Sequence, residues 1–330
     1  MATAARTTGT VERDTLRREQ ILGAVQRRGA LAVLALVVVV ASVTLDGFLT
    51  LANIENVLLH ASFLALIAVG MTFVVITGGV DLSVGSLLAL GGVLAASFAG
   101  VAWPLGFAVP VLACGAIGLL NGLLIAKAKL PFFIVTLAAL LGVRGLALLL
   151  PGLLPPTITE SGTFSWFGRG EVLGIDVPII IAALTLLVGA VVLNRTRFGE
   201  AVFAVGGSEE AARLSGVPVD RVKILAYTMS GALAGLAGAL VAAWLSVGLP
   251  TAGEAWELYA IAAVVLGGTL LTGGAGSMLG TLAGLLLFYT IQNVINQVGT
   301  LTSYVQQMVI GGFVIVVVAA QTYLARKRTD

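Results

Sequence analysis

The chain has 330 residues, of which 58% are hydrophobic and only 10% are charged, and its formal net charge is +2. A soluble domain keeps roughly a quarter of its residues charged, so this composition excludes the soluble classes and indicates a membrane protein. The apolar runs recur at the length of about 20 residues that a helix needs to cross a bilayer, without the alternation typical of barrel strands. We therefore predict an all-α polytopic membrane protein.

The first segment, residues 1–29, is polar and basic and lacks a signal-peptide cleavage pattern, so we expect a cytoplasmic tail. A transmembrane domain is expected over residues 30–325, followed by a basic cytoplasmic tail over 326–330. Ten apolar segments of this domain are expected to cross the membrane: Ala30–Leu45, Ile54–Ile76, Gly85–Ala99, Pro104–Ala126, Phe132–Leu150, Pro178–Leu193, Ile224–Val247, Leu258–Leu271, Met278–Val294 and Tyr304–Tyr323.

The positions of the charged residues test this layout. Of the 18 Lys and Arg residues, all except Arg144 and Arg169 fall on the same side as the N-terminus, which the positive-inside rule assigns to the cytoplasm. The tryptophans fall on the opposite side, where an aromatic belt and contact with an outside partner both remain open; they are Trp103, Trp166, Trp244 and Trp256. Both termini are therefore predicted to be cytoplasmic.

A short sequence recurs along the chain. Ile76–Gly79 reads ITGG and Leu271–Gly274 reads LTGG, and each follows one apolar segment and precedes another. Both motifs fall at the inner ends of even-numbered segments, so we predict a weak internal repeat whose two units run parallel. Transporters are often built from such repeats, although short glycine-rich turns also match by chance.

Sequence motifs for catalysis or metal binding are absent. There is no phosphate-binding G-x-x-x-x-G-K-[ST] motif, so any ATP that drives this protein is hydrolysed by another chain. The single histidine, His60, has neither a second histidine nor a nearby cysteine with which to hold a metal. We expect neither a catalytic residue nor a metal or cofactor bound by this chain.

Residues 195–223 are the one long interior segment with a high charge density. Within it, the order of residues predicts a short helix, because a serine precedes two glutamates and a glycine follows the last turn. The helix and its caps comprise Ser208, Glu209, Glu210, Ala211, Ala212, Arg213, Leu214, Ser215 and Gly216. An ordinary connecting loop is the alternative, and we favour a rigid helix that docks into a groove of a soluble partner.

The stretch Thr77–Ser86, TGGVDLSVGS, has two interpretations. It is either a turn at the inner surface, with Asp81 and Ser83 capping the next helix, or a break in a helix whose N–H groups line a transport pathway. Gly78 and Gly79 allow a tight reversal in both cases. The absence of Lys and Arg is unusual for a cytoplasmic turn and keeps the second interpretation open.

Several polar residues fall within the apolar segments. Arg144 is a charge inside the membrane and, with Gly78 and Gly79, a candidate for structure or gating. Gln292, Asn293 and Asn296 share one helical turn, and their amides suit either sugar hydroxyls or bonds between helices. The residues that we expect to line a pathway are Asp81, Ser83, Asn121, Gln292, Asn293 and Asn296.

Three classes of function compete: a subunit of an ATP-driven transporter, an ion-coupled carrier for a small polar solute, and a membrane scaffold. An ion-coupled carrier normally places several carboxylates or histidines within its helices, and this chain offers few. A scaffold has no need of a docking helix on its inner side.

Four blocks of sequence carry a resemblance. Gly70–Ser86 (GMTFVVITGGVDLSVGS) resembles the signature of the monosaccharide ABC-importer permeases of the ribose, xylose and galactofuranose type. Ala204–Gly216 resembles their ATPase-coupling segment, and Pro250–Gly253 and Ala260–Thr269 resemble two further blocks. The resemblance covers about residues 30–325 in order. It departs at Tyr259, where these proteins usually have Asp, and at Ser208, where Asn is common.

The resemblance implies an inner-membrane permease that pairs with a second permease subunit, identical or related, within the lipid bilayer of a bacterium. It also implies a cytoplasmic ABC ATPase that binds ATP and Mg, an extracytoplasmic sugar-binding protein, and no nucleic acid. Leu270–Gly274 and Gly299–Ser303 resemble the galactofuranose branch more than the ribose branch. The resulting hypothesis is alternating access, in which ATP-driven movement of the partner pushes Ser208–Gly216 and tilts the attached helices.

Overall fold

The computed structural model describes residues 30–152, 154–158 and 162–299, together with positions 308, 311, 312 and 315. Its elements follow the chain as a helix over Ala30–Thr44, α2 (Leu51–Ile76), α3 (Val84–Ala99), α4 (Leu105–Ala126), α5 (Phe132–Leu149), α6 (Thr163–Arg169), β1 (Glu171–Val172), β2 (Ile175–Asp176), α7 (Val177–Arg195), α8 (Arg197–Gly207), α9 (Glu209–Leu214), α10 (Val219–Leu245), α11 (Trp256–Leu266) and α12 (Met278–Val298). The two strands pair in an antiparallel hairpin.

Six helices are long and apolar enough to cross a membrane, namely α2, α4, α5, α7, α10 and α12. The helix Ala30–Thr44, α3 and α11 are apolar but shorter. The prediction of an all-α polytopic membrane protein is therefore confirmed. Each of these helices overlaps a segment predicted from the sequence, although α11 ends at Leu266 and not at Leu271 as predicted. The tenth segment, Tyr304–Tyr323, lies almost entirely outside the described residues, so the count of ten spans stays a prediction.

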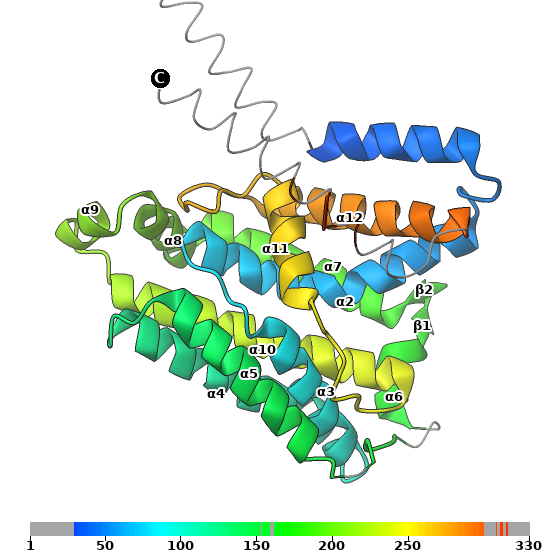
Figure 1. Ribbon diagram of the computed structural model, residues 1–330, viewed down its shortest axis with the longest axis horizontal. Coiled ribbons are helices and arrows are strands. Elements are labelled where there is room, and N and C mark those ends of the chain that lie inside the picture. Colours follow the sequence, from blue (N-terminus) through cyan, green and yellow to red (C-terminus); the bar gives the residue numbers. More distant parts are fainter. Residues whose placement is uncertain are drawn as a thin grey trace, which may run out of the picture.

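Residues 195–223 and residues 162–176 lie at opposite ends of the helices (Figure 1). At one end, α7 leads into α8 and α9, from which α10 returns along the bundle. At the other end lie α6 and the hairpin of β1 and β2. These three short elements lie between two of the predicted apolar segments and were not predicted from the sequence, because elements this short leave little periodicity to detect.

The helix α3 begins inside the protein. The chain leaves α2 at the end of the bundle that carries α8 and α9, runs back through Thr77–Ser83, and starts α3 part-way along the bundle (Figure 1). Asp81 and Ser83 are both 0% exposed, so this linker is a break between helices and not a surface turn. The capping role predicted for Ser83 was wrong, because its side chain makes no cap bond to α3.

The helix α10 packs against α3 and α4 through glycines. A Cβ added at Gly118 of α4 would lie 2.3 Å from the carbonyl oxygen of Tyr227, and one added at Gly238 of α10 would lie 2.1 Å from that of Leu88 on α3. Helix backbones approach this closely only where side chains are small. Without a side chain between them, α10 and its neighbours form one tightly packed unit.

The two glycine motifs meet at the end of the bundle that carries α8 and α9, where the N–H of Gly274 donates to the carbonyl oxygen of Ile76 at 2.9 Å. The predicted repeat is nevertheless not supported. The first motif follows α2, a helix of 26 residues, and the second follows α11, a helix of 11 residues.

Candidate functional site

The charged segment folds into two helices, α8 and α9, and the sequence predicted only the second. Thr196 caps α8 by accepting from the N–H of Gly199 at 3.2 Å. Ser208 caps α9 by accepting from the N–H of Ala211 at 3.2 Å, and Gly216 has a φ of +81° just beyond its end. The short helix predicted over this stretch, with its serine cap and left-handed glycine, is therefore confirmed.

The helix α9 packs by one face and exposes another. Ala212 is buried at 5% exposure, whereas Leu214 is 85% exposed at the end of the helix. Glu210 is also exposed, and no ion pair involves it within the described residues. A six-residue helix is marginal alone in water, so the buried face fixes its position and leaves Glu210 and Leu214 free to meet another molecule.

Glu209 ties α9 to the first turns of α10. Its carboxylate accepts from the ammonium group of Lys223 at 2.5 Å and from the guanidinium group of Arg213 at 3.4 Å. The hydrogen bond from Lys223 lowers the pKa of Glu209 below its ordinary value, because it stabilises the charged form. The two adjacent glutamates therefore differ in their contacts: Glu209 holds α9 against α10, and Glu210 is exposed.

The C-terminal end of α8 packs closely against both glycine motifs. A Cβ added at Gly206 would lie 1.7 Å from the carbonyl oxygen of Ile76 and 2.4 Å from the amide nitrogen of Gly274. Gly206 is therefore the position where the charged segment contacts the end of α2 and the linker before α12. Movement of α8 must displace the backbone at both places.

A buried hydrogen-bond network surrounds Asp81 in the linker between α2 and α3. One carboxylate oxygen accepts from the N–H of Ser83 at 3.0 Å and from its hydroxyl at 2.6 Å, and the other accepts from the hydroxyl of Ser230 on α10 at 2.8 Å. Asn121 of α4 donates to the Ser83 hydroxyl at 3.2 Å. The structure thus brings Asp81, Ser83 and Asn121 together, but as a buried network; their place in a pathway stays a prediction.

The glycines of the same linker are held against α10 and the second motif. Gly78 has a φ of +80°, and a Cβ at Gly79 would lie 2.5 Å from the hydroxyl oxygen of Tyr227. That hydroxyl donates to the carbonyl oxygen of Val80 at 3.3 Å. A side chain at Gly79 would push the linker away from α10, and one at Gly78 would be strained by the positive φ. The structural or gating role expected for both residues stays a prediction.

The amides of α12 are split between packing and exposure. Asn293 and Asn53 of α2 donate to each other, at 2.8 and 3.1 Å, which is the interhelical bonding that the sequence left open. Asn296 is exposed and Gln292 is half-buried. Their assignment to a pathway stays a prediction.

Arg144 and His60 each contact residues that are distant in the sequence. Arg144 on α5 donates to the carbonyl oxygens of Pro250 and Ala252 at 2.7 and 2.8 Å, so it holds the turn between α10 and α11. His60 packs edge-on against Trp244, with the ring centroids 5.3 Å apart. Among the described residues there is no group of His, Cys, Asp and Glu that could hold a metal ion.

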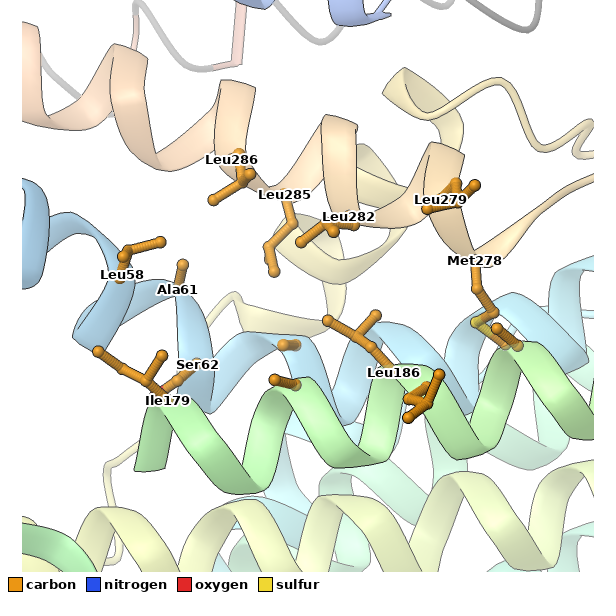
Figure 2. A pocket seen from close by; sticks show the side chains of 14 residues that line it. Leu58, Ala61, Ser62, Ile179, Leu186, Met278, Leu279, Leu282, Leu285 and Leu286 are labelled. Carbon is orange, nitrogen blue, oxygen red and sulfur yellow. The ribbon is translucent and has the colours of Figure 1, made fainter. Parts of the chain in front are cut away.

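A pocket of about 330 Å³ lies between α2, α7 and α12 (Figure 2). Its walls are almost entirely apolar, with Leu58, Leu186 and Leu282 among the lining side chains. The hydroxyl of Ser62 also lines it but donates to the carbonyl oxygen of Leu59 at 2.6 Å. A small polar solute needs hydrogen-bonding partners where it binds, so this pocket is not suited to one.

Comparison with known proteins decides the family. The family described as the permease component of branched-chain amino acid transport systems matches residues 53–318. The chain belongs to this permease family. The permease is 44% identical to a ribose import permease of Bacillus subtilis, covering 89% of this chain and 92% of that protein. It is 43% identical to a ribose import permease of Escherichia coli (86% and 89%) and 39% identical to an L-arabinose ABC transporter permease of Azospirillum brasilense (92% and 90%). No solved structure matches the permease.

Some residues that organise the permease were not singled out from the sequence. Gly206 carried a usable signal, because a glycine inside a helix often marks a close approach of two backbones. Tyr227 and Ser230 carried none, since their partners lie far away in the sequence. Ser230, for example, is 149 residues from Asp81.

Proposed function

We propose that this permease is the membrane subunit of an ABC importer for a monosaccharide, with its termini and α9 on the cytoplasmic side of a bacterial inner membrane. The sugar-importing relatives support the substrate class. Ten spans, a second permease subunit and an extracytoplasmic sugar-binding protein belong to the proposal. A separate ATPase binds ATP and Mg and hydrolyses ATP, and this chain binds no cofactor.

The observation that carries the mechanism is the placement of α9. Ser208 caps the helix, and the ion pair between Glu209 and Lys223 holds it against α10. Leu214 is exposed at the end of the protein where most of the basic residues lie. A partner ATPase that moves α9 also moves α8, whose Gly206 presses on the ends of α2 and of the linker before α12. Alternating access then follows from the tilt of these helices, and the linker with Asp81 is pulled along by α10.

Uptake into proteoliposomes tests the proposal. Vesicles that contain the permease, its ATPase and the binding protein should accumulate labelled ribose or arabinose only when ATP is supplied to the ATPase side. Leucine in excess serves as the control for substrate class and should not compete. Accumulation of leucine would overturn the sugar assignment, and gradient-driven uptake by the permease alone would favour an ion-coupled carrier.

A further inference from the structure

Five ion pairs at the inner end of the permease join into one network. Asp220, in the first turn of α10, pairs with Arg213 of α9 at 2.9 Å and with Lys129 and Lys127 of the turn between α4 and α5 at 3.3 and 3.6 Å. Arg213 continues to Glu209, and Glu209 continues to Lys223. The network therefore connects α9, the start of α10 and the turn between α4 and α5.

Asp220 is the point at which these connections meet. Its side chain is 23% exposed, whereas those of Lys127, Lys129 and Arg213 are 65%, 58% and 50% exposed. Three flexible cations thus converge on one well-placed carboxylate. Lys129 also has a φ of +56°, a left-handed conformation that side chains other than glycine adopt at a cost in energy. Its bond to Asp220 helps to hold the turn in that conformation.

The helix that carries Asp220 reaches the buried linker. Tyr227, which follows Asp220 on α10, donates to the carbonyl oxygen of Val80. Further along the same helix, Ser230 donates to the carboxylate of Asp81. Because the backbone of α10 packs directly against those of α3 and α4, we treat α10 as a rigid helix that connects its first turn to the linker after α2. Whatever is fixed to its first turn moves with the linker.

We propose that Asp220 is a positioning residue for energy coupling, which joins α9 and the turn between α4 and α5 to α10 so that the three move as one body. This inference rests on the proposed function, because it assumes that a partner moves α9. Exposed ion pairs add little to the stability of a folded protein, so the role of Asp220 lies in transmission of movement and not in folding. Removing its charge should leave the permease folded.

The transport test compares Asp220→Asn with Asp220→Glu and Glu200→Gln in the complete transporter. Glu200 is an exposed residue of α8 that takes part in no ion pair within the described chain. Asp220→Asn should lower the number of sugars carried per ATP roughly tenfold while ATP hydrolysis continues, and Asp220→Glu should restore most of that ratio. A wild-type ratio in Asp220→Asn, or an equal loss in Glu200→Gln, would overturn the proposal.

A distance measurement on the permease alone separates this inference from the proposed function. Spin labels at Ala128 and Leu214, both exposed, report the separation of the turn and α9. The distribution of distances should be narrow in the wild type and in Glu200→Gln, and broad in Asp220→Asn. An unchanged distribution would overturn the role of Asp220 even if the transporter carries sugar. A broadened distribution would support it even if uptake assays identify another solute.

Discussion

Replacing Asp81 with alanine tests the buried network most severely. The change leaves three donors without their acceptor: the N–H and hydroxyl of Ser83 and the hydroxyl of Ser230. Each buried donor that loses its partner costs about 1–3 kcal/mol. Rotation of the hydroxyls and relief from burying a carboxylate recover part of that sum, so we expect a net loss of about 3 kcal/mol. Asp81→Asn keeps one carbonyl oxygen and should lose less.

The assay for this prediction is thermal unfolding in detergent. Midpoints are compared at one heating rate, because membrane proteins often unfold irreversibly. A loss of about 3 kcal/mol should lower the midpoint by roughly 5 °C. Asp46→Ala is the matched control, since Asp46 is exposed, and it should change the midpoint little. If Asp81→Ala is as stable as the wild type, or if both variants lose the same stability, the reasoning about the network is refuted.

Two further predictions concern the charged segment. Gly206→Ala should abolish transport and weaken the contact with Ile76, because its Cβ has no room, whereas Gly207→Ala should be neutral, since its Cβ meets no described atom within 4 Å; equal uptake by both variants would contradict this. The lowered pKa of Glu209 means that its pairing stabilises α9 above the ordinary glutamate pKa and is lost as the pH falls through the folded value. The free energy of hydrogen-exchange protection of the α9 amides should therefore fall in acid, by less than about 1 kcal/mol. In Glu209→Gln this decrease with falling pH should be absent.

The parts of the fold that the sequence predicted well are local. A run of apolar residues marks a membrane helix without any partner, and Ser208 and Gly216 cap α9 through contacts within a few residues. The helix α8 was missed, although its buried positions, Gly199, Val202 and Val205, recur every third residue as they do on one face of a helix.

The site depended on contacts that no local pattern reveals. Asp81 drew attention as a polar residue beside glycines, but its partner Ser230 is 149 residues away. Asp220 resembled an ordinary residue of a first helical turn, although it binds cations from two other parts of the chain. The depth of the linker after α2 was likewise open, because its glycines suit a surface turn as well as a break within the bundle.

Cross-linking at Leu214 tests the central claim, that a partner ATPase binds α9. Leu214 ends α9 and Leu173 lies between β1 and β2, and the two are exposed, at 85% and 99%. Those elements lie at opposite ends of the permease (Figure 1). The native Cys114 is buried at 0% exposure and should give little background. In the assembled transporter, a cross-linker on Leu214→Cys should capture the ATPase and one on Leu173→Cys should not. Capture of the ATPase from Leu173→Cys, or none from Leu214→Cys, would contradict the account.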